Sequence, residues 1–401
     1  MEEERITAEK VEKTEKKVKI DIDRYRAKEG EKISLKKFST NCDMDVDKEY
    51  VKTVSMTAAL EELSLYQAKL YAQNTYGLII VLQAMDAAGK DGTIKHVFSH
   101  LDPNGVHVVS FKQPTTEEKD HDYMWRINKA LPRRGNIGIF NRSHYEDVIV
   151  TRVHNLISTG QLPRDLIDKN IWMERYEQIN NWEKYLHQNG FYMVKIFLHV
   201  SKEEQQKRLI DRIFNQEKNW KFSMGDIHER EHWDEYRELY EELLENTSKD
   251  KSPWYIVPAD NKWFTRYVVA LITLDVLKKI DPKFPKLSPE EQKQLERRNG
   301  TDLQVINHRG DSLREAGYDT TEDDEGNTIT DPVFRNFFAD PHEEAGASGE
   351  DDDNEYKIQP AVIDKGIVDA QGIGHAECLY SCEEDREVSC DLLDLLETFL
   401  S

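Results

Sequence analysis

The sequence has few cysteines, no long hydrophobic run and no apolar segment near its N-terminus. Its 401 residues include four cysteines, of which only Cys42 lies in the first 300. Such sparse cysteine excludes a disulfide framework and favours a reducing compartment. No apolar run approaches the roughly 20 residues that a membrane-spanning helix needs. The acidic residues 1–5 have the pattern of neither a signal nor a transit peptide. We therefore expect a cytoplasmic protein without a membrane partner.

An excess of basic residues is also absent, and the negative charge is concentrated near the C-terminus. The formal net charge is -22. Residues 301–401 hold 27 of the 77 acidic and 6 of the 55 basic residues, which leaves 50 acids and 49 bases in residues 1–300. This near-neutral first part argues against an extended nucleic-acid groove, so we expect no nucleic-acid partner.

Hydrophobic patterning predicts an α/β domain. The predicted strands are 78–82, 106–111, 136–140, 192–200 and 254–257. The predicted helices are 51–75, 90–101, 116–131, 143–156, 162–187, 202–214, 226–245 and 263–280. Strands that alternate with helices are typical of a parallel sheet flanked by helices, with the functional site at the carboxyl ends of the strands.

Composition divides the chain into three regions. Residues 1–50 are highly charged, contain two β-like segments at 18–22 and 33–38, and are expected to form an N-terminal arm. The main domain is expected over residues 51–285, because three prolines between 282 and 289 mark its end. Residues 286–401 form an acidic extension, part of which we expect to be disordered. Within this extension, residues 290–298 and 391–400 suit short helices.

The first predicted strand leads into a loop with the features of a phosphate-binding loop. Lys90 holds the lysine position of the pattern G-x-x-x-x-G-K-[ST], but Ala84 replaces the first glycine and Asp91 the hydroxyl residue. Because the hydroxyl that would ligate Mg²⁺ is missing, Asp86 becomes the candidate metal ligand. The helix that follows offers free N–H groups to an anion. A glycine-containing turn without function is the alternative, which the neighbouring strand, helix and lysine disfavour. The other candidate loop residues are Ala87, Ala88, Gly89, Asp91 and Gly92.

A second candidate site follows the third predicted strand. Asn141 stands where a P-loop enzyme carries the acid at the end of this strand. Glu146 and Asp147, one turn into the next helix, could restore the negative charge that an amide lacks. Arg142 would neutralise charge on a transferring phosphoryl group. The alternative is a helix cap with a solvated ion pair, which the nearby phosphate loop makes the weaker interpretation.

A basic strip between residues 201 and 226 is the third candidate. Arg208 and Arg212 share one helix face, and Lys218 and Lys221 follow in a loop. Above a phosphate site, such a strip would act as a lid. A solvated helix face is one alternative, and single-stranded nucleic acid on the interspersed aromatic residues is another.

Two further motifs are given no functional role. Residues 254–263 have the pattern of an ordinary strand-to-helix turn. His375, Cys378 and Cys382 are too few, and too irregularly spaced, to predict a metal site.

Taken together, these motifs resemble the polyphosphate kinase 2 family. The matching segments are 84–93, 140–146, 220–222 and 253–260, and the similarity extends over about residues 18–285. The resemblance implies a P-loop kinase fold of the thymidylate kinase type. It also implies reversible, Mg²⁺- or Mn²⁺-dependent phosphoryl transfer between inorganic polyphosphate and a nucleotide. Most of the family has an aspartate where this chain has Asn141, and the pairing of Asn141 with Glu146 resembles the third class, whose members phosphorylate AMP and ADP.

The resemblance also implies roles for individual residues. Asp86 would bind the metal and orient the acceptor phosphate, while Lys90 and Arg142 would hold the reacting phosphates. Arg126 and Arg133 would clamp nucleotide phosphates. The expected partners are polyphosphate and adenine or guanine nucleotides, in a dimeric or tetrameric homo-oligomer. The lid residues expected to bind polyphosphate are Arg208, Arg212, Lys218 and Lys221.

Two alternative functions remain at this point. One is an ATP-dependent nucleoside monophosphate kinase on the same fold. The other is a non-catalytic polyphosphate-binding protein, for which the uncharged Asn141 would be the sequence feature.

Overall fold

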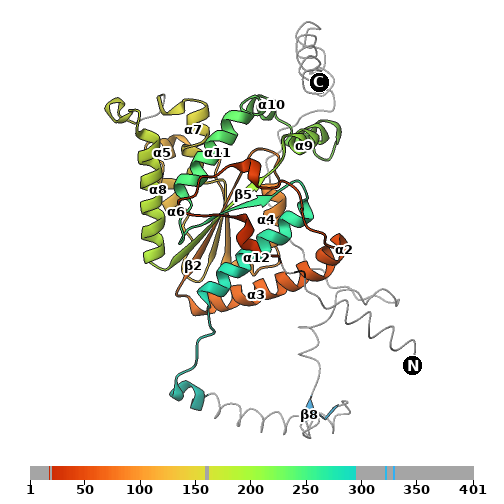
Figure 1. Cartoon of the computed structure of the whole chain (residues 1–401). Coiled ribbons are helices and arrows are strands. Elements are labelled where there is room, and N and C mark those ends of the chain that lie inside the picture. The colour runs from red at the N-terminus through yellow and green to blue at the C-terminus, as the bar shows by residue number, and fades with distance from the viewer. Residues whose placement is uncertain (1–17, 19, 159–161, 295–320, 323–327, 330–401) are drawn as a thin grey trace, which may run out of the picture. The chain divides into compact units, whose positions relative to one another are not determined.

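The computed structural model describes residues 18, 20–158, 162–294, 321–322 and 328–329 (Figure 1). The chain divides into two compact units, Met1–Pro285 and Lys286–Ser401. In the second unit the described residues comprise a helical segment at 289–294 and a two-stranded antiparallel pair, β7 (Thr321–Glu322) and β8 (Thr328–Ile329). The predicted helix at 391–400 and the group around His375 lie outside the described residues.

A six-stranded sheet forms the centre of the first unit. Its order is β1-β6-β5-β2-β4-β3, and every pairing is parallel except that of β1 with β6. The predicted parallel α/β class is therefore confirmed. The strands are β1 (Arg26–Ala27), β2 (Gly77–Ala84), β3 (Val106–Ser110), β4 (Ile137–Asn141), β5 (Phe191–His199) and β6 (Trp254–Pro258).

The central strand β2 is buried along its whole length. Helices cover both faces of a parallel sheet, which explains why this strand is a continuous hydrophobic run and does not alternate with polar residues. Leu82 of β2 pairs with Asn141 of β4, and Asn141 pairs in turn with Ser110 of β3. This register brings the ends of three strands to one edge of the sheet.

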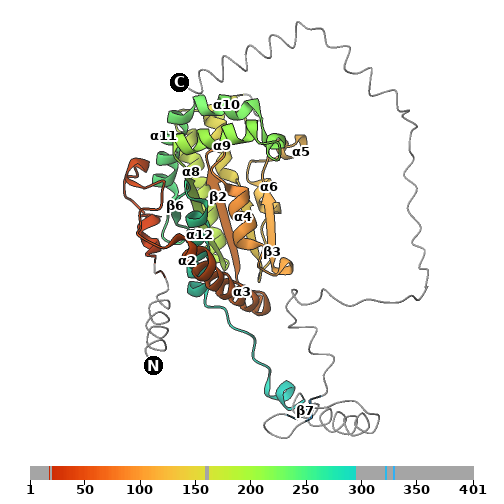
Figure 2. The ribbon, with the colours of Figure 1, turned by 90° about the vertical axis from the view of Figure 1, so that its right-hand side faces the viewer.

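Helices pack on both faces of the sheet. On one face, α12 lies against α3 and α4, and on the other α8 packs on β5 and α11 (Figure 1). Figure 2 shows α9, α10 and α11 together at one end of the strands. None of the described helices is long and apolar enough to cross a membrane. The α-helices are α2 (Lys48–Tyr50), α3 (Met56–Gln73), α4 (Lys90–Phe98), α5 (Thr116–Lys119), α6 (Trp125–Lys129), α7 (Val150–Val153), α8 (Ile171–Gln188), α9 (Lys202–Phe214), α10 (Met224–Glu231), α11 (Trp233–Thr247) and α12 (Lys262–Ile280).

Several predicted helices are shorter or broken in the structure. The helix predicted at 116–131 is split into α5 and α6, and the one at 226–245 is split at His232. The helix predicted at 162–187 begins only at Ile171. The helix predicted at 143–156 is a 3₁₀ turn, η5 (His144–Asp147), followed by α7. Here three consecutive residues, Ser143, His144 and Tyr145, are fully buried. Three consecutive helical residues span about 200°, which is wider than the apolar stripe of a surface helix.

The prediction of β-structure in two segments of the N-terminal arm, 18–22 and 33–38, was also wrong. The first segment ends where a 3₁₀ turn, η1 (Ile22–Tyr25), begins, and the second contains another, η2 (Leu35–Lys37). Among the described residues of the arm, only β1, which lies between the two segments, joins the sheet. The Asp21 side chain accepts a hydrogen bond from the Asp23 N–H and so caps η1. A local cap of this kind competes with strand pairing, which alternation of residue types does not reveal.

Candidate active site

The loop between β2 and α4 is a tight turn with strained backbone. Ala87 has a φ of 58°, and Gly89, the N-cap of α4, has a φ of 105°. Glycine adopts such angles readily, whereas alanine rarely does. The first N–H groups of α4 have no acceptor within the helix, and a helix start of this kind suits a phosphate group.

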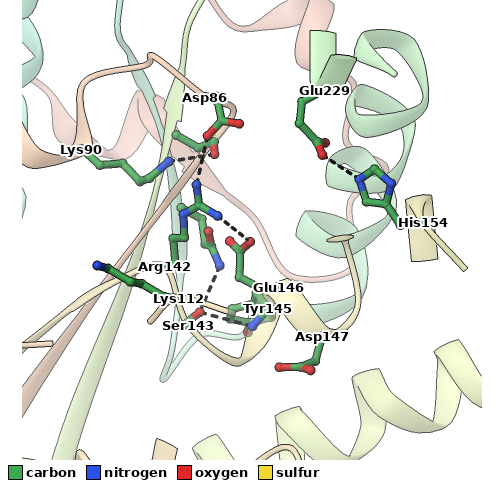
Figure 3. Close-up of polar contacts among 12 residues, drawn as sticks. Asp86, Lys90, Lys112, Arg142, Ser143, Tyr145, Glu146, Asp147, His154 and Glu229 are labelled. Atoms are coloured by element: carbon green, nitrogen blue, oxygen red, sulfur yellow. Dashed lines mark hydrogen bonds and ion pairs between the residues drawn. The ribbon is translucent and has the colours of Figure 1, made fainter. Parts of the chain in front are cut away.

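Lys90 reaches back across this loop. Its Nζ donates a hydrogen bond to the Ala84 carbonyl oxygen over 3.1 Å (Figure 3). Burial, and then the neighbouring Arg142, lower the pKa of Lys90. An anion held in the loop would favour the charged form of this lysine.

Arg142 connects the loop with the segment after β4. Its Nη2 lies 3.1 Å from Oδ1 of Asp86, and its Nη1 lies 3.5 Å from Oε2 of Glu146 (Figure 3). Arg142 itself has a φ of 64°, and its N–H bonds to the Leu82 carbonyl over 3.0 Å. Burial raises the pKa of Glu146, against the opposing effects of Arg142 and Lys90. The structure thus brings four predicted residues, two cationic and two acidic, into one cluster.

Asn141 lies beside this cluster and contacts the start of α4. Its Nδ2 donates to Oδ1 of Asp91 over 2.9 Å and to Oγ of Ser110 over 3.3 Å. The sequence placed Asn141 and Asp91 at the site separately but did not predict their contact.

The two predicted clamps, Arg126 and Arg133, lie at opposite ends of the strands. Arg126 is buried, donates to the Lys112 carbonyl over 2.7 Å, and lies 3.5 Å from Oδ2 of Asp147. It lines a pocket of about 290 Å³ with Ser110, Lys112 and Lys129.

Arg133 instead precedes the amino end of β4, where the Gly135 N–H bonds to the Tyr76 carbonyl. The eight residues of β2 separate this edge from the loop, roughly 25 Å at about 3.3 Å per residue. Arg133 therefore does not reach the phosphate loop of its own chain, and the prediction that it clamps a phosphate there was wrong.

Arg208 holds the phosphate loop in place and does not extend from the lid as predicted. It is 8% exposed, and Nη1 donates to the carbonyls of Ala87 and Ala88 over 3.1 and 2.8 Å. Nη2 donates to the carbonyls of Ala259 and Asp260 over 2.7 and 3.0 Å. Because these carbonyls and Glu204 engage its guanidinium, Arg208 acts here as a brace for the loop.

The other predicted lid cations are paired within the lid. Arg212 forms an ion pair with Asp226, and Lys218 forms one with Asp211. The Lys221 ammonium lies 4.9 Å from the centre of the Trp220 ring, which is 78% exposed. These contacts join α9, the 3₁₀ turn η8 (Asn219–Lys221) and α10 to one another.

Sequence reasoning missed two residues near Asp86. Gln205 is buried, donates from Nε2 to the Asp86 carbonyl over 3.1 Å, and accepts from Arg230 over 2.9 Å. Its position three residues before Arg208 was the available signal, because both lie on one face of α9. Asp226 is the second: burial and then Asp86 raise its pKa, so the two carboxyl groups are near each other.

The acidic groups fit a divalent cation that also binds substrate. No cluster of three or more His, Cys, Asp or Glu in the described part of the chain forms a complete metal cage. Mg²⁺ commonly takes only one or two carboxylates and completes its shell with water and substrate phosphates. Asp86 can be such a ligand, because its carboxylate lies at the loop and, within the described part of the chain, forms an ion pair with Arg142 alone.

Comparison with known proteins agrees with this geometry. The model of the family "Polyphosphate kinase 2 (PPK2)" matches residues 45–285. An ADP-polyphosphate phosphotransferase of Rhodopseudomonas palustris is 42% identical over 280 residues, which cover 69% of this chain and 97% of the relative. An AMP/ADP-polyphosphate phosphotransferase of Meiothermus ruber is 39% identical over 277 residues, with 67% and 98% covered.

A solved structure gives the same result. The crystal structure of polyphosphate kinase 2 from Arthrobacter aurescens TC1 is similar at 37% identity with a TM-score of 0.62, covering 68% of this chain and 95% of that one. These matches confirm the predicted family, the P-loop kinase-like fold and an enzyme of the phosphotransferase class. The chain belongs to the polyphosphate kinase 2 family.

Proposed function

We propose that the enzyme transfers the terminal phosphoryl group of inorganic polyphosphate to AMP and to ADP. The observation that carries this proposal is the cluster in which Lys90 and Arg142 meet Asp86 and Glu146 at the phosphate loop. The similarity to the Meiothermus ruber relative, which is named for both acceptors, supports the dual specificity.

The reaction requires charge neutralisation more than proton transfer. An oxygen of the acceptor phosphate attacks the terminal phosphorus, the new P–O bond forms, and the bridging P–O bond breaks to leave a shortened polyphosphate. The attacking oxygen is already ionised near neutral pH, so no general base has to remove a proton. Positioning and electrostatic stabilisation then supply most of the acceleration.

Lys90 and Arg142 are the groups that would neutralise the transferring phosphoryl group. Arg142 is held from two sides by Asp86 and Glu146, so its guanidinium is oriented before substrate arrives. Preorganised cations of this kind lose little entropy at the moment of reaction. Asp86 would hold Mg²⁺, which when bound neutralises phosphate charge and aligns the two phosphates.

The pocket beside β3 is the site we propose for the acceptor nucleotide. It adjoins the reacting centre, because its lining residue Ser110 accepts a hydrogen bond from Asn141. Arg126 and Lys112 line it and supply positive charge for an α-phosphate. Arg126 is kept in place by Asp147, the residue that follows Glu146.

A donor-and-acceptor assay tests this function. AMP and ADP are each supplied with either long-chain polyphosphate or ATP as the sole donor. We expect products from both acceptors with polyphosphate. Faster turnover of AMP with ATP than with polyphosphate would favour a nucleoside monophosphate kinase. Tight polyphosphate binding without product would favour a non-catalytic protein. Either result would overturn the proposal.

A further inference from the structure

Two cations on α12 lie beside the phosphate loop. Lys262 belongs to the turn at 254–263, for which the sequence predicted only a structural role, and Arg266 belongs to the helix predicted after it. Lys262 begins α12 and Arg266 follows one turn later, so both lie on one side of the helix. Arg208 fixes this helix start against the loop, because it bonds to the Ala259 and Asp260 carbonyls as well as to those of Ala87 and Ala88.

Arg266 lies against the first turn of α4. A Cβ atom built on Gly92 would lie 3.8 Å from Nη2 of Arg266. Arg266 is half-buried and Lys262 is exposed. Burial, followed by the positive charges of Arg208 and Lys218, lowers the pKa of Lys262, and the attraction of Glu204 is weaker. Lys262 therefore faces the brace and the lid at the same time.

These two cations differ from the lid cations Arg212 and Lys218 because neither forms a direct ion pair with any described residue. Arg212 and Lys218 form ion pairs with Asp226 and Asp211. For Lys262 and Arg266, the described residues provide no side-chain hydrogen bond and no ion pair. Like charges held close together without a direct ion pair favour the binding of an anion.

The strand order places these cations and the acceptor pocket on opposite sides of the loop. The order β3-β4-β2-β5-β6 puts the loop after the central strand. The acceptor pocket lies at β3, and α12 follows β6 at the other side. In-line transfer requires attacking and leaving groups on opposite sides of the phosphorus, so the leaving polyphosphate extends away from β3.

We propose that Lys262 and Arg266 bind the polyphosphate chain beyond its reacting phosphates and give the enzyme its preference for long donors. This inference rests on the proposed function. A repeating anion fits an exposed and a half-buried cation one helical turn apart, and each phosphate beyond the loop adds affinity without entering the reacting centre. A short donor ends before it reaches α12 and gains nothing from these side chains.

The test compares long and short chains in the variant Lys262→Met/Arg266→Met. With ADP as acceptor, we expect the KM for long-chain polyphosphate to rise about tenfold, with kcat nearly unchanged. Tripolyphosphate, measured as a competitor of the long chain, should keep its inhibition constant. The variant Lys262→Arg/Arg266→Lys keeps both charges and should restore the KM. Lys279→Met removes a charge at the far end of α12, where Lys279 pairs with Asp275, and serves as the matched control.

The outcomes separate this inference from the function on which it rests. An unchanged KM for the long chain would overturn the role of α12. So would an inhibition constant for tripolyphosphate that rises by the same factor as the KM for the long chain. The single variant Lys262→Met changes an exposed side chain and gives the same comparison if the double variant does not fold. If the wild type turns over no polyphosphate, the proposed function fails, and equilibrium binding of the two chain lengths still tests the α12 site.

Discussion

Asn141 donates a hydrogen bond from Nδ2 to Oδ1 of Asp91 over 2.9 Å. These are two positions at which the chain departs from a standard P-loop enzyme: the acid at the end of β4 has become an amide, and the hydroxyl after the loop lysine has become an acid. The contact joins the two departures directly, and we expect them to be coupled. The amide supplies a donor that the carboxylate at position 91 needs, and a second carboxylate at 141 would remove it.

Exchanging these two side chains tests the coupling. Asn141→Asp should lower kcat/KM with ADP by about tenfold, because two carboxylates then face each other at the loop. The double variant Asn141→Asp/Asp91→Asn restores one amide and one carboxylate and should recover most of the loss. Steady-state kinetics of the single and double variants give the interaction free energy. Simple additivity of the two changes would contradict the coupling.

Arg208→Lys tests the brace of the phosphate loop. Lysine keeps the charge but lacks the planar fork that reaches four carbonyl groups on two segments. We expect kcat/KM to fall by about a hundredfold, because a shift of about 1 Å in a positioned group has an effect of that size. Arg212→Lys, in the same helix but paired with one lid carboxylate, is the control and should lose much less. Equal losses in the two variants would mean that Arg208 acts only as a lid charge.

A fully buried ion pair behind the site should dominate the stability of this region. Nζ of Lys195 lies 2.6 Å from Oε2 of Glu183 and also donates to the Thr247 carbonyl and to the Tyr145 hydroxyl. Lys195→Met leaves Glu183 buried and unpaired, and should reduce the free energy of unfolding by about 3–5 kcal/mol. Lys195→Met/Glu183→Leu removes both charges and should regain much of it. Urea denaturation measures the free energy of unfolding of both variants. A double variant less stable than the single one would contradict the claim that an unpaired Glu183 causes the loss.

His199 should make the enzyme sensitive to acid. Burial lowers the pKa of His199 to about 4, although Asp260 opposes the shift. The unfolded chain binds this proton near pH 6.5, so the folded state has its full stability above that pH. Stability is lost as the pH falls from about 6.5 towards 4, up to about 3 kcal/mol for the full shift. His199→Gln, which cannot take up the proton, should flatten this part of the profile of unfolding free energy against pH. Identical slopes for the variant and the wild type would contradict the assignment.

Much of the fold and part of the site could be predicted from local sequence. β2 is a continuous apolar run and α9 matches its predicted bounds, Lys202–Phe214, because Ser201 caps it through the Glu204 N–H. Asp86, Lys90 and Arg142 belong to short motifs next to predicted strands, so parallel topology brings them together.

The rest depends on contacts between distant segments. The turn at His144 buries three consecutive residues, Ser143, His144 and Tyr145. This burial is a tertiary effect that helical periodicity does not encode. Arg133 looked suitable by type and proximity in sequence, yet the direction of β4 places it at the other edge. Arg208 follows β5 and Arg266 follows β6, so both are near the loop because of where these two strands lie in the sheet. Residue type alone does not distinguish a brace from a lid.

ATP formation from ADP, with long-chain polyphosphate as the only phosphoryl donor, tests the central claim most directly. The wild type should form ATP. Lys90→Met should lose at least about a thousandfold in kcat, because it removes a preorganised charge at the transferring group. Its unfolding midpoint in urea should stay close to that of the wild type. Absence of ATP with the wild type, or a rate in Lys90→Met near that of the wild type, would contradict the account.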